Sequence, residues 1–291
     1  MEPVYRAVEG LVAAGYLPDL LANAFLVRGL LAALVVGPLL AAVGTVLVAK
    51  RLVFFTQTIG HASLAGVALG LILGEPLDAT YGGLFGFCLI VALLLTFLRN
   101  RLRAAEDQIT GVVLAQVLGI GIIAMVLVTQ RFNIHQVEAA LFGCLITLTD
   151  TDLILLLIVG PSVLIVLALI YNPLMRATIN PVLARAWGGR PVLIDYAFIL
   201  LATTAMVASL KLVGALLVLV LVVIPAATAR NLSFRMAPFV WIAMLVGMLS
   251  AVGGLILSSL WPIPTGAAIV LAASMLFYGS VAARFAVARG S

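Results

Sequence analysis

The feature that most restricts the fold is a series of nine apolar runs, each long enough to cross a membrane as a helix. They lie at residues 24–49, 54–74, 79–98, 110–130, 152–171, 194–210, 212–230, 237–260 and 265–284. A helix needs about 20 mainly apolar residues to cross the hydrocarbon core of a bilayer. Only 9% of the residues are charged, against about 25% in soluble proteins. The sequence therefore predicts an all-α, polytopic transmembrane bundle that forms one domain over residues 1–291. A broken or re-entrant helix at the single cation Lys211 would reduce the count to eight spans.

The charges between the runs indicate which loops face the cytoplasm. Lysine and arginine collect in every second loop, at Lys50 and Arg51, at Arg99, Arg101 and Arg103, at Arg176, Arg185 and Arg190, at Arg230 and Arg235, and after the last run at Arg284 and Arg289. Because cytoplasmic loops are enriched in these residues, an odd number of spans places the N-terminus outside and the C-terminus inside. The net charge of +5 arises from these loops, and no basic run of the kind that binds nucleic acid is present. Residues 1–22 are apolar but interrupted by charges, which predicts a helix lying in the membrane interface.

The run at residues 54–74 carries polar groups at helical spacing. Gln57 and His61 are four residues apart, so their side chains lie one above the other on one face of a helix. Inside hydrocarbon, an imidazole and an amide must face protein or a wet cavity. The pair is therefore a candidate functional site.

Small residues and a proline indicate where helices pack closely or bend. Gly66, Gly70 and Gly74 recur at every fourth position and predict a stripe along which a second helix packs. Pro225 lies two turns before the cytoplasmic end of the seventh run. Since proline removes a backbone donor, we expect that helix to hinge there.

The second histidine and the two cysteines are weaker candidates for a metal site. His135 and Glu138 are three residues apart in an outward-facing segment, but two ligands are too few to define a metal site, and a solvated helix start is the alternative. Cys88 and Cys144 lie in apolar surroundings without metal-ligand spacing, and we interpret both as core residues.

The longest cytoplasmic segment, residues 172–193, predicts a short exposed helix. Asn180 suits the N-cap and Pro181 the first turn, and a Gly-Gly pair follows the helix. Its side chains include Leu183, Ala184, Arg185 and Trp187. Apolar side chains beside an arginine on an exposed helix favour contact with a partner protein. The alternative is a loop that packs only on its own bundle.

Six stretches, in order along the chain, resemble the permease subunits of the manganese/zinc/iron ABC importers, which have a fold of the metal-chelate type. They are RLVFFTQTIGHASLAGVALG, AEDQITG, ALFG, NPVLARAWG, KLVGALLVLVLVVIPAATARN and PIPTGAAIVL, and the match runs from Val27 to Phe285. The resemblance implies a multi-pass protein of the prokaryotic cytoplasmic (inner) membrane, surrounded by lipid. It further implies the membrane-spanning subunit of an ATP-driven importer for zinc or manganese, with ferrous iron as a third candidate.

The resemblance also implies the partners. The permease would pair with a second copy of itself and receive metal from a metal-binding lipoprotein or periplasmic protein. It would bind no cofactor, because ATP belongs to separate ATPase subunits that contact the cytoplasmic coupling helix, here NPVLARAWG within residues 172–193. In the family an aspartate precedes the second-span histidine by four residues. Here Gln57 takes its place, and its carbonyl ligates a cation without compensating the charge. The site is then weak and transient, or selectivity lies elsewhere.

Two other classes of protein compete with this interpretation. A proton-coupled secondary transporter would also bury His61, but it would need intramembrane carboxylates, and we expect none of the eleven acidic residues well inside a span. An intramembrane metalloprotease would need a motif such as HExxH, which the sequence lacks. The sequence has no P-loop either, so we expect no enzyme activity from this chain.

Overall fold

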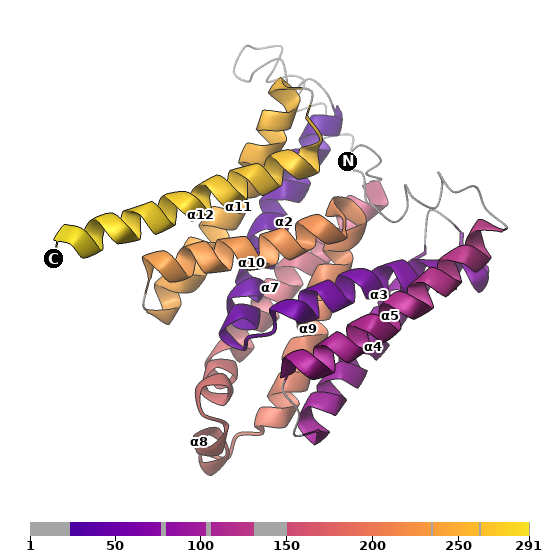
Figure 1. Ribbon diagram of the computed structural model, residues 1–291, viewed down its shortest axis with the longest axis horizontal. Helices are drawn as coiled ribbons and strands as arrows, with labels where there is room; N and C mark the ends of the chain where they lie inside the picture. The colour runs from indigo at the N-terminus through magenta and orange to yellow at the C-terminus, as the bar shows by residue number, and fades with distance from the viewer. Residues whose placement is uncertain are drawn as a thin grey trace.

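The computed structural model describes residues 24–76, 80–102, 106–130, 150–233, 235–261 and 263–290, and these are organised entirely by helices (Figure 1). The helices are α2 (Ala24–Ala49), α3 (Val53–Ile72), α4 (Tyr81–Arg101), α5 (Glu106–Thr129), α7 (Asp150–Ile179), α8 (Pro181–Ala186), α9 (Pro191–Val213), α10 (Ala215–Leu232), α11 (Met236–Leu260) and α12 (Thr265–Gly290). Within this part of the chain, all but α8 are long and apolar enough to cross a membrane. The prediction of an all-α bundle with nine spans is confirmed. The interfacial helix predicted at residues 1–22, and His135, Glu138 and Cys144, lie outside the described residues.

Helix α2 lies at the centre of the bundle, where it packs against α7, α10 and α11. Its glycines allow the closest of these contacts. A Cβ atom at Gly37 would lie 2.6 Å from the carbonyl oxygen of Gly247 on α11, and one at Gly44 would overlap the carbonyl oxygen of Val222 on α10. Without Cβ atoms at these positions the backbones approach directly, as in other membrane helix pairs with small residues at the interface.

Helix α3 packs against α4 and α5. Gly66 and Gly70 face Gly83 of α4, and a Cβ atom at Gly83 would lie only 2.5 Å from Cα of Gly70. Gly74 is different. It lies beyond the end of α3 with φ of +92°, and a Cβ atom there would have no neighbour within 4 Å. Glycine adopts this left-handed backbone readily. Of the three glycines in the predicted stripe, Gly66 and Gly70 therefore pack closely against a second helix, whereas Gly74 does not.

The predicted cytoplasmic segment, residues 172–193, contains the last turns of α7, all of α8 and the first turn of α9. Helix α7 continues through Pro173 because the residues that follow are packed: Leu174, Met175 and Ala177 are buried. This burial offsets the hydrogen bond that the proline removes.

The two runs near Lys211 are separate helices. The break lies three residues later, at Gly214, whose φ is +84°. Only glycine adopts this conformation readily, which explains why the chain turns there rather than at the cation. Pro225 lies within α10, which stays continuous from Ala215 to Leu232, and the predicted hinge stays a prediction.

Candidate functional site

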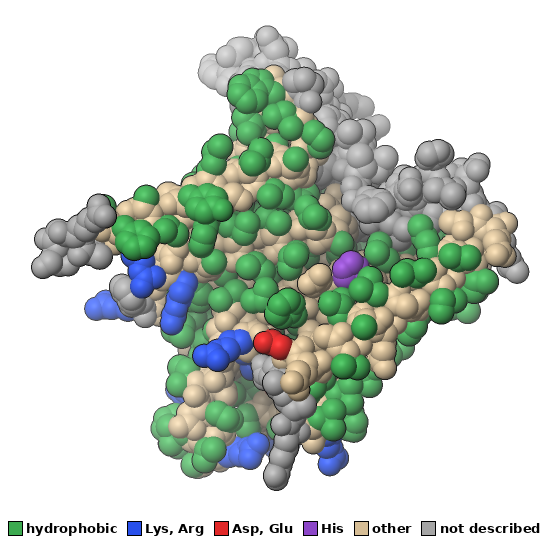
Figure 2. Space-filling view, viewed as in Figure 1, with side chains coloured by type: hydrophobic (Ala, Val, Ile, Leu, Met, Phe, Trp, Pro, Cys, Tyr) green, Lys and Arg blue, Asp and Glu red, His purple; other side chains and the backbone are tan. Residues whose placement is uncertain are grey.

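Gln57 and His61 lie on the open face of α3. The side chains between them are buried, as are those on the opposite side of the helix, whereas Gln57 and His61 are both half-buried. Neither side chain makes a hydrogen bond to another described residue. Figure 2 shows the histidine at the surface, surrounded mainly by apolar side chains and backbone. The imidazole and the amide are thus both available to a ligand.

The neighbourhood of His61 is set by close helix contacts. The preceding residue, Gly60, faces the start of α10, because a Cβ atom at Gly60 would lie 3.5 Å from Cβ of Ala215. The site therefore lies where α3 passes the break between α9 and α10. Among the described residues, no group of three or more histidine, cysteine, aspartate or glutamate side chains is placed to hold a metal ion. The described residues of one copy offer a cation two donor groups at this point.

The segment at residues 172–193, predicted to couple to an ATPase, contains a short helix with a cap at each end. The side-chain oxygen of Asn180 accepts hydrogen bonds from the backbone amides of Val182 (3.1 Å) and Leu183 (3.0 Å) at the start of α8. At the other end, the amide of Gly189 donates to the carbonyl of Ala184 at 3.0 Å. These contacts satisfy backbone groups that a six-residue helix would otherwise leave free.

Helix α8 lies at the lower tip of the bundle (Figure 1), and three large apolar side chains in it or at its end are exposed. Val182, Leu183 and Trp187 are 73%, 44% and 64% exposed, whereas Ala184 is buried against the bundle. The guanidinium group of Arg176 lies 5.7 Å from the centre of the Trp187 ring, a cation–π contact that holds the indole beside the helix. Of the residues that the sequence predicts for coupling, Leu183, Arg185 and Trp187 are thus exposed together.

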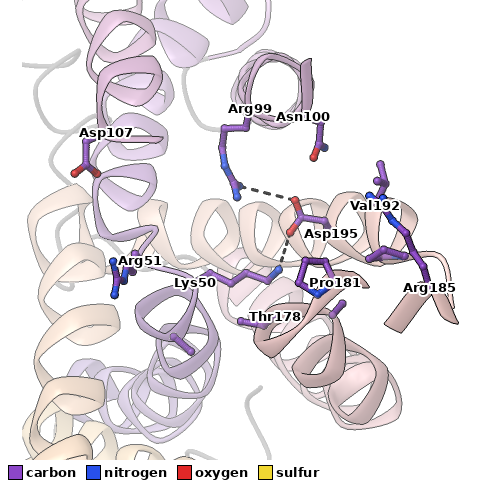
Figure 3. Close-up of a pocket in the computed structure, with 13 residues that line it drawn as sticks. Lys50, Arg51, Arg99, Asn100, Asp107, Thr178, Pro181, Arg185, Val192 and Asp195 are labelled. Carbon is purple, nitrogen blue, oxygen red and sulfur yellow. Dashed lines mark hydrogen bonds and ion pairs between the residues drawn. The ribbon is translucent and has the colours of Figure 1, made fainter. Parts of the chain in front are cut away.

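A pocket of about 700 Å³ lies beside α8 at the same end of the bundle (Figure 3). Its walls come from α2, α4, α5, α7, α8 and α9, and its charged lining consists of Lys50, Arg51, Arg99, Arg185, Asp107 and Asp195. Residues 50–51, 99–102 and 176–190, which belong to loops predicted to be cytoplasmic, therefore meet on one side of the molecule. Figure 2 shows lysine and arginine side chains gathered toward the same lower part of the visible face.

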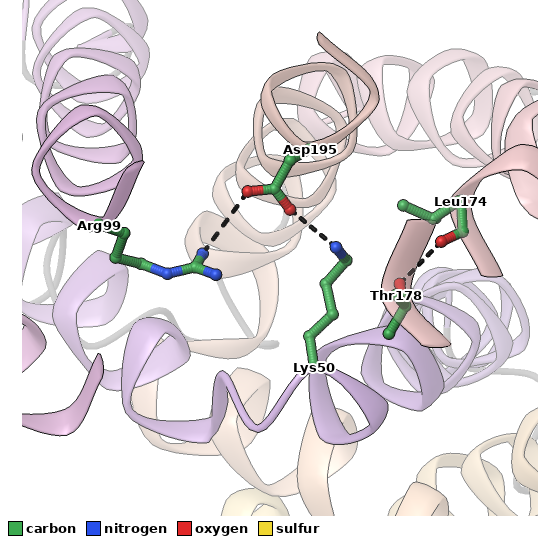
Figure 4. A network of polar contacts seen from close by, with 5 residues as sticks. All are labelled: Lys50, Arg99, Leu174, Thr178 and Asp195. Atoms are coloured by element: carbon green, nitrogen blue, oxygen red, sulfur yellow. Dashed lines mark hydrogen bonds and ion pairs between the residues drawn. The ribbon is translucent and has the colours of Figure 1, made fainter. Parts of the chain in front are cut away.

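Asp195 is the part of this region that sequence reasoning missed. Its carboxylate accepts a hydrogen bond from Lys50 Nζ at 2.7 Å and lies 3.9 Å from Arg99 Nη1 (Figure 4). A sequence signal was present, since Asp195 follows an arginine-rich segment at the start of an apolar run. That signal does not identify the partners, one of which directly follows α2 while the other lies on α4.

Comparisons with known proteins agree with this architecture. The model of the ABC 3 transport family matches residues 22–284. The manganese transport system membrane protein MntC of Halalkalibacterium halodurans is 31% identical over 265 residues, which cover 90% of this chain and 88% of the relative. The high-affinity zinc uptake system membrane protein ZnuB of Haemophilus influenzae is 31% identical over 256 residues, which cover 87% and 93%.

The fold also matches a solved structure, PsaBC from Streptococcus pneumoniae in complex with Fab. The TM-score is 0.78 at 25% sequence identity, and the match covers 96% of this chain and 95% of that one. The nine-span bundle is that of metal-chelate type ABC transporters, as the sequence predicts.

Proposed function

Because the chain belongs to the ABC 3 transport family and is a multi-pass protein of the bacterial cell membrane, we propose that it forms the path of an ATP-driven importer for a divalent transition metal. The observation that carries this proposal is the Gln57 and His61 pair on the open face of α3. Family membership favours a transport role over catalysis. It also favours the importer over a proton-coupled secondary transporter.

The number of donors argues for two copies of the chain. One copy supplies one imidazole and one amide, whereas divalent transition metals take about four to six ligands. A second copy, with its α3 facing the first, would bring two His61 and two Gln57 side chains to one point. The homodimer would therefore complete a four-donor site, of which the described part of one chain supplies two donors.

Zinc and manganese are the proposed cargo, with ferrous iron as a third candidate. Relatives with a comparable match are named for manganese and for zinc. Imidazole nitrogen suits zinc slightly better than manganese. The neutral Gln57 amide compensates the loss of the hydration shell less than a carboxylate would, which suits a site that passes the ion on. A metal-binding lipoprotein or periplasmic protein would deliver the ion from outside.

The exposed face of α8 is the proposed contact for the ATPase subunit. Asn180 and Pro181 shape the start of the helix, Ala184 anchors it, and the exposed side chains fill a groove on the partner. Burial of Leu183 and Trp187 would contribute several kcal/mol, at about 25 cal/mol per Å² of apolar area before association costs are subtracted. Arg185 beside them would supply a charged contact at the rim.

The test is transport by the reconstituted complex. The permease, its ATPase and its binding protein are placed in liposomes, and uptake of Mn²⁺ and of Zn²⁺ is measured separately with ATP on the cytoplasmic side. We expect uptake of at least one metal that stops when ATP is replaced by a non-hydrolysable analogue. A complex that hydrolyses ATP but moves neither metal, or moves metal without ATP, would overturn the proposal.

A further inference from the structure

The buried charge cluster at the cytoplasmic end connects three helices that are distant in the sequence. Asp195 lies in the second turn of α9, Lys50 directly follows α2, and Arg99 lies in the last turn of α4. One oxygen of Asp195 accepts from Lys50 Nζ at 2.7 Å, and the other lies 3.9 Å from Arg99 Nη1. Figure 4 shows both cations directed at the same carboxylate.

Burial makes this cluster stronger than a surface ion pair. The side chains of Lys50, Arg99 and Asp195 are 9%, 10% and 12% exposed. Charges that are shielded from water attract one another more strongly. Removal of one partner leaves a buried charge without compensation. The three helix ends should therefore move together.

Asp195 sits close to the proposed ATPase contact. Helix α8 ends at Ala186, and α9 begins at Pro191, one turn before Asp195. Pro181 and Arg185 of α8 line the same pocket as Asp195 (Figure 3). A displacement of α8 would thus reach Asp195 through a connection of only a few residues.

Lys50 sits at the other end of the path, in the tight turn between α2 and α3. Arg51 has a positive φ of 59°, and the amide of Leu52 donates to the carbonyl of Leu47 at 2.8 Å. Helix α3 begins at Val53, so Gln57 and His61 follow within about two turns. The turn that holds Lys50 therefore fixes the starting point of the helix that carries the candidate metal ligands.

We propose that Asp195 is a positioning residue for transport: through Lys50 it transmits the movement of α8 to the start of α3, and so to His61. The inference rests on the proposed function of α8 and α3. Asp195 contacts neither the metal nor the ATPase in this scheme. Since packed helices move as rigid bodies, a fixed contact at the turn is sufficient to shift the whole of α3.

The first test separates ATP hydrolysis from transport. In the reconstituted complex that assembles, Asp195→Asn should leave basal ATP hydrolysis per complex within about twofold of the wild type, even where the buried change lowers the yield. The amount of Mn²⁺ or Zn²⁺ moved per ATP should fall about tenfold or more. The matched control is Asp107→Asn, which changes an exposed carboxylate of the same pocket and should keep the wild-type ratio.

A double-mutant cycle tests whether the two residues act as one contact. Lys50→Met should lower the metal-to-ATP ratio as Asp195→Asn does, and the double variant should be no worse than the more severe single one. Lys50→Met also serves as the second variant if Asp195→Asn fails to assemble, because Asp195 then keeps Arg99. A wild-type ratio in both single variants, or additive losses in the double variant, would overturn the inference.

Hydrogen exchange in the permease alone tests the contact without any metal. The amides of Lys50 and Leu52 should exchange about tenfold faster or more in Asp195→Asn and at the wild-type rate in Asp107→Asn. Unchanged exchange at this turn would overturn the inference even if metal uptake fails in every sample. Failure of the wild-type complex to move either metal would instead count against the proposed function.

Discussion

In the proposed metal path, the charge of the residue at position 57 would determine how strongly α3 holds the cation. Gln57→Asp places a carboxylate one helical turn before His61, and a carboxylate ligates divalent cations while compensating their charge. We expect uptake within about threefold of the wild type, together with tighter retention of the metal. Equilibrium binding of Mn²⁺ and Zn²⁺ to the purified complex, beside uptake, measures both. An inactive but assembled variant would show that the surroundings of the pair are built for a neutral amide.

His61 is the stronger donor of the pair, and its removal should stop transport without unfolding the permease. His61→Ala deletes an imidazole that makes no hydrogen bond to another described residue, so no buried group loses a partner. Uptake should fall by about 100-fold, whereas ATPase binding and basal ATP hydrolysis should persist. The control is Phe54→Ala, which removes a half-exposed ring from the same face but no donor. Wild-type uptake by His61→Ala would remove this residue from the metal path.

At the scale of single residues, the sequence predicts which side chains are neighbours when their spacing along one helix decides it. Gln57 and His61 share a face because they are four residues apart, and the structure places both on the open side of α3. The ion pair of Asp195 with Lys50 joins residues 145 positions apart. No periodicity relates them, so the contact becomes visible only once α2 and α9 are placed side by side.

At the scale of single helices, α4 offers a matched pair of glycines that tests the close contact with α3. A Cβ atom at Gly83 would lie 2.5 Å from Cα of Gly70, whereas one at Gly86 has no neighbour within 4 Å. Gly83→Ala should destabilise the permease by about 1–3 kcal/mol through overpacking. Gly86→Ala should be neutral or stabilise it by up to about 1 kcal/mol through helix propensity. Thermal denaturation in detergent measures both, and equal effects would contradict the close approach.

Helix α8 can be tested by placing a charge on its apolar face. Leu183→Asp should release the ATPase from the membrane, because the groove that covers Leu183 would have to bury a carboxylate without a partner. The permease should stay folded, since the side chain lies outside the packed bundle. Co-purification of tagged ATPase measures the effect.

The control for this variant is Leu102→Asp, a similar change at an exposed leucine just beyond α4. It should retain the ATPase at wild-type yield. If instead Leu102→Asp releases the ATPase and Leu183→Asp does not, the contact lies on the segment at residues 99–107.

Helix positions could be predicted closely from the sequence because each span must be apolar over a fixed length. The ends were less predictable, since they depend on tertiary packing. Burial of Leu174 carries α7 past Pro173, and the left-handed backbone of Gly214 decides where α9 gives way to α10. Composition reports neither effect.

At the scale of the whole molecule, the two candidate metal ligands lie on a face of α3 that is directed away from the helices packed against it. The described residues bring together only Gln57 and His61 on the open face of α3, while the rest of that helix is packed against α4, α5, α9 and α10. A cation at this face would have protein on one side only. A second copy on the other side would enclose the ion and exclude water, which strengthens every ligand bond.

A mixed dimer tests whether the site belongs to both copies. Wild-type and His61→Ala chains with different tags are co-expressed, and two successive affinity steps isolate the dimer with one imidazole. If both copies ligate the same ion, loss of one imidazole in four donors should reduce uptake about tenfold or more. Two independent paths would instead retain about half of the wild-type rate, because each path would contain its own complete site.

A wild-type dimer carrying both tags, and a mixed dimer with Phe54→Ala, control for the tags and for disturbance of the interface. Half-activity in the His61 hybrid would exclude a shared site and place one complete path in each chain, so that further ligands would have to be sought outside the open face of α3.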